Sequence, residues 1–231
     1  MIRGALVDFG GTIDTDGIHW MRMFSMAYQS CGLPIDGLRD AYVYAERYLG
    51  RNAVIGADFT FRETLGRKIH LQLEYMRMNA DIGTILDFCY SYVARNISVV
   101  SAPALQMLSE RIPLVLVSNF YGNMRTVLRE FGIDRLFTDV IESSVAGVRK
   151  PDPEIFSMGV RSLGLPAGET VAIGDSPDKD MIPAAAAGCR TVWLSGDGWA
   201  DDAVCAADYT IHSLAELPGM GLTSDSPRNN L

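Results

Sequence analysis

The chain has 231 residues, of which 48% are hydrophobic and 21% charged, and its formal net charge is −8. This composition is typical of a globular protein, and the length suffices for one large domain or two small ones. The Lys and Arg residues are scattered without a basic run, which argues against a nucleic-acid partner. No apolar run approaches the ~20 residues of a membrane-spanning helix, so we expect no membrane partner.

The cysteines and the first residues bear on the cellular compartment. Four widely spaced cysteines without a CxxC pair indicate neither a zinc site nor a disulfide framework. The chain enters an apolar segment at Ile2 without the pattern of a signal peptide. We therefore expect a protein of a reducing compartment, the cytoplasm. The polar segment 223–231 is expected to be frayed.

Apolar runs and helical patterns alternate over most of the chain. The runs are typical of strands buried in a parallel sheet, and they cover 2–7, 114–117, 139–141, 171–173, 191–194 and 209–211. The helical patterns between and after them cover 103–111, 123–131, 153–163, 178–187 and 213–217. Strands alternating with helices predict an α/β fold with an open parallel sheet flanked by helices.

The segment between the first two strands has only helical patterns, and we expect four helices there. The residues expected to cap or end them are Gly32, Gly50, Thr60 with Glu63, and Asp81. We interpret residues 16–97 as an inserted all-α cap domain, and residues 1–15 with 98–231 as an α/β core domain. The tyrosines at 42, 44 and 48 are expected to belong to the core of the cap.

Three polar clusters directly follow predicted strands: Asp8, Ser118–Asn119 and Gly174–Asp175. The carboxyl ends of parallel strands share one edge of a sheet, where ligands bind. Lys150 begins a segment that leads back to this edge. Carboxylates beside a phosphate suit Mg²⁺, and an ammonium and a hydroxyl suit the phosphate oxygens.

These clusters belong to four short motifs, which are Val7–Thr12, Val117–Asn119, Arg149–Glu154, and Gly174–Asp180 followed by Ala184, Ala187 and Gly188. In this order the motifs resemble those of the haloacid dehalogenase (HAD) superfamily. Each motif is weak alone, but the four together span the whole predicted core. The resemblance implies a HAD-like Rossmannoid sheet, with a cap inserted between the first and second motifs.

The resemblance also implies a role for each matching position. Asp8 would be the nucleophile that accepts a phosphoryl group as an aspartyl-phosphate, and Lys150 would balance its charge. The phosphate-binding group would comprise Ser118, Asn119, Gly11 and Thr12, with Thr12 also supporting the loop. The Mg²⁺ ligands would be Asp8, the backbone carbonyl of Gly10, Asp175, and Asp180 directly or through water. The implied activity is hydrolysis of a small phosphorylated metabolite.

Gly10 departs from the pattern of most phosphatases in the superfamily. They carry a second aspartate here, which protonates the leaving group and then activates the attacking water. A glycine does neither, and general acid–base help is typically worth ~10²–10⁴ in rate. The nearby Asp14 and Asp16 are interpreted as turn residues rather than as replacements for the missing acid.

Three functions therefore stay open. The first is a Mg²⁺-dependent phosphohydrolase whose turnover is impaired by Gly10. The second is another HAD reaction, dehalogenation or phosphonatase chemistry, although the intact fourth motif argues against dehalogenation. A phosphonatase would use a cap lysine as a Schiff base, and Lys68, the sole lysine of the cap, is interpreted as a solvated helix-surface residue. The third is a non-catalytic protein that binds a phosphorylated ligand or a partner.

The substrate's leaving group would be recognised by the cap. The basic cap residues considered for this role are His19, Arg22, Arg47, Arg51 and Arg62. Each is more simply explained as a solvated charge on a helix, and the sequence does not choose among them.

Overall fold

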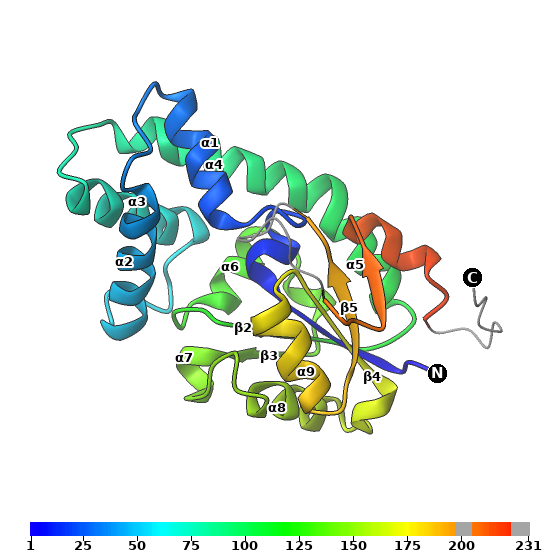
Figure 1. Ribbon diagram of the computed structural model, residues 1–231. Coiled ribbons are helices and arrows are strands. Elements are labelled where there is room, and N and C mark those ends of the chain that lie inside the picture. The colour runs from blue at the N-terminus through cyan, green and yellow to red at the C-terminus, as the bar shows by residue number, and fades with distance from the viewer. Residues whose placement is uncertain (197–204, 223–231) are drawn as a thin grey trace.

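A six-stranded parallel sheet forms the centre of the computed structural model, which describes residues 1–196 and 205–222 (Figure 1). Its strands are β1 (Gly4–Val7), β2 (Leu114–Ser118), β3 (Asp139–Glu142), β4 (Thr170–Gly174), β5 (Arg190–Leu194) and β6 (Tyr209–Ile211). They lie in the order β3-β2-β1-β4-β5-β6, and each neighbouring pair is parallel. The predicted α/β fold is confirmed, whereas the segment 223–231, expected to be frayed, lies outside the described residues.

The helices follow the predicted order with shifted ends and two differences. They are α1 (Trp20–Ser30), α2 (Leu38–Arg51), α3 (Phe61–Tyr75), α4 (Ile82–Asn96), α5 (Ala102–Ser109), α6 (Met124–Glu130), α7 (Ser143–Ala146), α8 (Glu154–Leu163) and α9 (Ile182–Ala186). The helix α7 was not predicted, and the predicted helix 178–187 is divided into a turn and α9. Short helical turns lie at Phe9–Ile13, Ile97–Ser101, Asp134–Leu136, Ala167–Glu169, Pro177–Met181 and Leu214–Gly219. Among the described helices, none has the length and apolar character that crossing a membrane requires.

Alternate residues of each strand pack on opposite faces of the sheet. Leu6, Val115 and Val117 join a cluster with Ile155 and Phe156 of α8. On the other face, Ala5, Val7, Leu114 and Leu116 belong to a larger cluster. This cluster includes residues of α5 and α6 and continues into the four helices between β1 and β2. The sheet is thus buried on both faces, which explains why its strands are continuous apolar runs.

The helices α1 to α4 form the block predicted between the first two strands (Figure 1). Thr60 and Glu63 make both bonds of the predicted capping box, and the side chain of Asp81 caps α4. The prediction that Gly50 ends the second helix is wrong, because α2 continues through it to Arg51. The division into a core domain and a cap domain stays a prediction.

The tyrosines of α2 correct one prediction about this block. Tyr44 and Tyr48 are 36% and 37% exposed, so they lie at its surface and not in its core. The ring of Tyr44 packs against the rings of Tyr48 and Tyr75. Only Tyr42 packs against the buried cluster, as predicted.

Two asparagines join the helical block to the carboxyl edge of the sheet. Asn96, the last residue of α4, donates through its amide to the carbonyl oxygens of Ile13 and Asp14, both at 3.2 Å. Asn123, which precedes α6, donates to the Phe59 carbonyl and to the Thr64 hydroxyl. These bonds hold the block over the edge where the predicted site lies.

Gly159 gives a test of the packing between α8 and the sheet. A Cβ built on this residue would lie 2.8 Å from Leu6 Cδ2 and 3.1 Å from Val117 Cγ2. Because overpacking a core costs about 1–3 kcal/mol, Gly159→Val should lower the free energy of unfolding by that amount in urea titrations. The control is Arg161→Val on the exposed side of the same helix, and an equal loss there would contradict this packing.

Candidate active site

The candidate site begins at the end of β1, the strand where the connections of the sheet change direction. β1 lies between β2 and β4, so Asp8, at its carboxyl end, lies at the switch point of an open parallel sheet. Ser118 ends β2, and Asp175 directly follows β4. The predicted polar clusters therefore meet at one edge.

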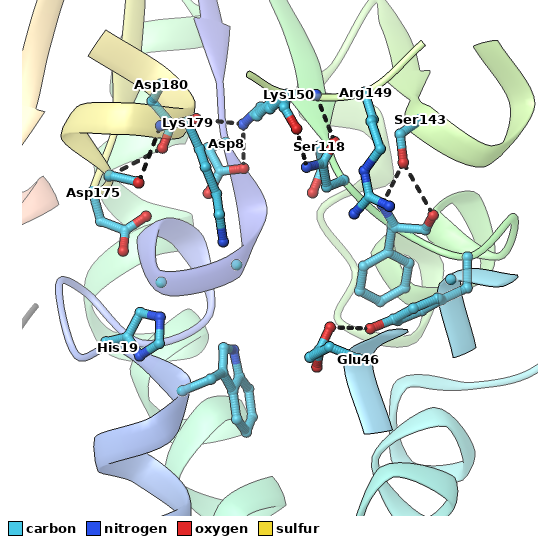
Figure 2. Close-up of a pocket in the computed structure, with 18 of the residues that line it drawn as sticks. Asp8, His19, Glu46, Ser118, Ser143, Arg149, Lys150, Asp175, Lys179 and Asp180 are labelled. Atoms are coloured by element: carbon cyan, nitrogen blue, oxygen red, sulfur yellow. Dashed lines mark hydrogen bonds and ion pairs between the residues drawn. The ribbon is translucent and has the colours of Figure 1, made fainter. Parts of the chain in front are cut away.

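Three carboxylates converge there. Asp8, Asp175 and Asp180 each offer one oxygen, and these oxygens lie within 4.8 Å of one another. Figure 2 shows the three side chains with Lys150 beside Asp8 and Asp180. Asp180, which belongs to the turn Pro177–Met181, also accepts a bond from the backbone of Ser176 at 3.1 Å. The structure thus brings together the three predicted carboxylate ligands.

Lys150 connects two of these carboxylates. Its Nζ atom lies 2.6 Å from Asp8 Oδ1 and 2.5 Å from Asp180 Oδ1, and its side chain is 2% exposed. Burial disfavours the ammonium, but the charges of Asp180 and Asp8 outweigh burial and raise the pKa of Lys150. Lys150 is therefore a permanent cation beside Asp8.

Asn119 fixes the backbone of Lys150. Its side-chain nitrogen donates to the Lys150 carbonyl at 3.1 Å, and its side-chain oxygen accepts from the Lys150 amide at 2.9 Å. This pair of bonds occupies the side-chain amide, which leaves the backbone of Asn119 as the group available for a phosphate. Ser118 is buried and lines the same pocket.

Gly11 and Thr12 shape the loop after Asp8. Gly11 has a φ of +90°, and a Cβ on it would overlap the Asp175 carboxylate, so glycine is required here. The Thr12 hydroxyl lies 3.1 Å from Asp8 Oδ2 and accepts from the Asp175 amide at 3.1 Å. The Gly11 amide donates to Asp14 Oδ1, and Gly11 lines the pocket, whereas Thr12 is fully buried. Their expected part in phosphate binding stays a prediction.

The charges of the cluster fit a divalent cation. Burial raises the pKa of Asp8 to about 6, although Lys150 partly offsets it. Burial and the charges of Asp180 and Asp8 raise the pKa of Asp175 well above its ordinary value. A single ammonium thus leaves three neighbouring carboxylates undercompensated. Oxygen donors with excess negative charge are the ligand set that Mg²⁺ prefers.

Open space lies next to Gly10. A Cβ built on this residue meets no other described atom within 4 Å, and its φ of −80° suits any L residue. Asp14 does not fill the space with a free carboxyl group. Its oxygens accept bonds from the Gly11 amide and the Trp20 indole, both at 2.7 Å, and burial raises its pKa to about 7.

The carboxylate oxygens of Asp16 also accept hydrogen bonds from the protein. It accepts bonds from the Ser213 hydroxyl and the Leu214 amide at 2.7 and 2.8 Å, so it ties the start of the helical block to the last helical turn. Both carboxylates accept bonds from the protein, and Asp14 also lines the pocket. This agrees with their interpretation as structural residues, although Asp14 is only 1% exposed.

A cavity of about 1570 Å³ lies between the helical block and the sheet edge. Asp8, Gly10 and Ser118 line it from one side. Of the basic residues considered for recognition of the leaving group, His19, Arg47 and Arg51 line it. Arg22 and Arg62 are not among the described lining residues, and Arg62 pairs instead with Asp87 on the surface. The burial of His19 lowers its pKa to about 4.

The interpretation of Lys68 as a solvated surface residue is wrong. This residue of α3 lines the cavity, and its side chain is only 12% exposed. Its Nζ lies 2.7 Å from Glu46 Oε1, and the hydroxyl of Tyr121 donates to Glu46 Oε2 at 2.5 Å. Sequence reasoning missed Glu46 and Tyr121 altogether. The signals available were the scarcity of lysine and the position of Tyr121 just after the second motif.

The family model of the haloacid dehalogenase-like hydrolases matches residues 2–188. The match includes the central strand, the helical block and all the carboxylates of the site. The chain therefore belongs to this family of hydrolases.

Two of the curated relatives that the chain resembles are phosphatases. Glyceraldehyde 3-phosphate phosphatase of Methanocaldococcus jannaschii is 43% identical over 91 residues, which are 39% of this chain and 40% of that enzyme. The chain thus spans less than half the length of this relative. Phosphoglycolate phosphatase of Yersinia pestis is 29% identical over 237 residues, which cover 96% of this chain and 95% of that enzyme.

Solved structures share the fold at lower identity. A magnesium-bound putative HAD-hydrolase from Bacillus subtilis, YfnB, has a TM-score of 0.58 and 20% identity, covering 94% of this chain and 97% of that chain. The 2-haloacid dehalogenase of Pseudomonas syringae pv. Tomato has a TM-score of 0.52 and 22% identity, covering 95% and 97%. At these identities the likeness shows the fold alone.

Removing Lys150 tests the electrostatics of the cluster. Lys150→Met leaves two buried carboxylates without their cation, which typically costs about 3–5 kcal/mol of unfolding free energy. Chemical denaturation without divalent metal should show this loss. Lys179→Met, which removes an exposed lysine of the same pocket, is the control and should change stability by less than about 1 kcal/mol. Similar small effects in both variants would contradict the ion-pair assignment.

Proposed function

We propose that this protein is a Mg²⁺-dependent phosphatase that hydrolyses a small phosphorylated metabolite through an aspartyl-phosphate on Asp8. One observation carries the proposal. The Asp8 carboxylate, the Lys150 ammonium and two further carboxylates form a single buried cluster that borders a large cavity. A nucleophile, a fixed cation and a metal-binding ligand set are the groups that phosphoryl transfer needs.

The reaction has two steps. An Asp8 oxygen forms a bond to phosphorus while the bond to the ester oxygen breaks, and the leaving group takes a proton. A water molecule then attacks the phosphorus, which releases inorganic phosphate and restores the Asp8 carboxylate. When bound, Mg²⁺ would neutralise charge on the phosphoryl oxygens and so favour attack by Asp8 on the phosphorus.

The remaining residues of the site orient these steps. Asp175, Asp180 and the Gly10 carbonyl would hold the metal with Asp8. Lys150 would stabilise the negative charge shared by Asp8 and the phosphoryl group, because Asn119 fixes its backbone and the Asp8 and Asp180 carboxylates hold its ammonium. Ser118 and the backbone of Asn119 would bind phosphoryl oxygens.

The relatives support this choice of substrate. The two compared above are phosphatases of small phosphorylated molecules, as their names state, and the Yersinia enzyme aligns over nearly the whole chain. The acidic cluster supports the choice of metal, since its ligands are all oxygen atoms.

Gly10 limits the rate in this proposal. Asp14 and Asp16 use their carboxylate oxygens in bonds to the protein, so neither supplies the missing proton transfer. The leaving group and the attacking water would then depend on bulk solvent. Substrates with acidic leaving groups should suffer least, because they depart without a proton.

The position of Lys68 bears on the phosphonatase alternative. A Schiff base requires a neutral amine. Burial alone would favour that form, but the adjacent charge of Glu46 outweighs it and raises the pKa of Lys68. Lys68 therefore stays protonated, and the structure favours phosphatase over phosphonatase chemistry. The non-catalytic alternative predicts ligand binding without turnover.

Phosphate release is the direct test of the proposal. With Mg²⁺, the protein should release phosphate from p-nitrophenyl phosphate and from members of a panel of small phosphate esters. EDTA should abolish release and added Mg²⁺ should restore it, because the carboxylates need the cation. Asp8→Asn should reduce release to background, since the amide is not a nucleophile.

Asp178→Asn, at an exposed position of the same pocket, is the matched control and should retain activity. Phosphate binding without release from any ester in the panel would instead support the non-catalytic alternative. Full activity of Asp8→Asn would contradict the role of Asp8.

Gly10→Asp tests whether the missing acid limits turnover. The open space beside Gly10 accommodates the side chain, so the variant should fold and kcat should rise by roughly 10²-fold, within the usual range for acid–base help. Gly10→Asn has the same size without the acid and should not show this gain. An unchanged kcat in the folded Asp variant would refute the explanation.

A further inference from the structure

Lys68 lies in the cavity with hydrogen-bonding capacity to spare. An ammonium has three N–H donors. Among the described residues, the oxygen that it pairs with is Glu46 Oε1, at 2.7 Å. Aromatic rings also lie near it, since Nζ is 5.1 Å from the ring centre of Tyr121 and 5.8 Å from that of Trp20, and the charge of Asp14 acts on it as well. Donors therefore remain for an oxygen of a bound molecule.

Glu46 fixes this ammonium and is not itself free to bind a ligand. Its second oxygen accepts the Tyr121 hydroxyl at 2.5 Å. Burial opposes the charge of Glu46, but Lys68 outweighs burial and lowers the pKa of the carboxyl group. The pair joins two cap helices to the loop after β2, which gives Lys68 a defined position and a constant charge.

The rest of the cavity wall is positive, although the chain as a whole carries a net charge of −8. Apart from the cluster around Asp8 and the hydrogen-bonded Asp14, the wall has five cationic residues and two carboxylates. The cations are Arg47, Arg51, Lys68, Arg149 and Lys179, and the carboxylates are Glu46 and Asp178. This imbalance favours a substrate with negative charge beyond its phosphate.

We propose that Lys68 binds a carboxylate of the substrate, which makes the substrate a small phosphorylated carboxylic acid. The proposal rests on the phosphatase function proposed above and adds its substrate class. Asp8 and Glu46 lie on opposite sides of the pocket in Figure 2, so the phosphoryl group at Asp8 and the carboxylate near Glu46 face different walls. Aromatic neighbours of Lys68 shield the contact from water and strengthen it.

Pairs of substrates that differ only in the carboxylate test the contact with Lys68 separately from binding of the phosphate. Phosphoglycolate and hydroxyethyl phosphate differ by a carboxylate in place of a hydroxymethyl group, as do phosphoglycerate and glycerol phosphate. The wild type should prefer the carboxylate of each pair. Lys68→Met should lower kcat/KM for the substrates with a carboxylate by about 10- to 100-fold, mainly through KM. It should change kcat/KM for the phosphate esters without a carboxylate by less than about threefold.

Arg67→Met is the matched control, because Arg67 is an exposed neighbour on the same helix and does not line the cavity. It should leave both preferences unchanged, and Lys68→Arg should retain part of the preference. Since Lys68→Met leaves Glu46 with one donor, the double variant Lys68→Met/Glu46→Gln removes both charges and keeps the test valid if the single variant unfolds.

Calorimetric titration with phosphoglycolate keeps the subsite test independent of turnover. If Lys68→Met binds phosphoglycolate more weakly, by the factor expected for KM, the result supports the subsite. Absence of phosphate release would contradict only the phosphatase function. Equal affinity and equal kcat/KM in the wild type and Lys68→Met overturn the subsite, while any phosphate release leaves the phosphatase function standing.

Discussion

The contact of Lys150 with Asp8 and Asp180 is the interaction on which the rest of the site depends. It joins the end of the central strand, the start of the segment before α8 and the turn after β4, three regions brought together only by the order of the sheet. Two carboxylates so close together would repel without this cation. Asn119 holds the lysine by its backbone, so β2 contributes to the same constraint. The fold itself thus holds the proposed metal ligands and the proposed nucleophile in place.

Gly10 leaves the structure of the site intact, and in the proposed mechanism it affects only the rate of the reaction. The buried carboxylates and the ammonium are all present, and the loop geometry depends on Gly11, where a positive φ and the nearby Asp175 require glycine. At Gly10 the backbone would accept a larger residue and the space is open. The glycine is therefore not demanded by packing. Asp14 and Asp16 accept bonds from the protein around it, and the proposed mechanism therefore treats acid–base help as the contribution that Gly10 removes.

The sequence predicted what depends on local pattern. The strands were predictable because burial on both faces makes them continuous apolar runs, and α3 because Thr60 and Glu63 form a capping box. The carboxylates were predictable because parallel strands end at one edge. Lys68 was not, since its burial depends on Glu46, 22 positions earlier, and on Tyr121, which is 75 positions from Glu46. The prediction that Tyr44 and Tyr48 are buried was also wrong because burial depends on distant contacts. A helical pattern does not show which face of the helix is covered by another helix.

Chemical trapping tests the central claim, that Asp8 carries the phosphoryl group, most directly. The protein turning over p-nitrophenyl phosphate with Mg²⁺ would be quenched in acid and reduced with borohydride, which converts an aspartyl-phosphate to homoserine. Mass spectrometry of the peptides should then locate the change at Asp8, where slow attack by water lets the intermediate accumulate. Steady turnover with no change at Asp8, or with the change at another carboxylate, would contradict the account.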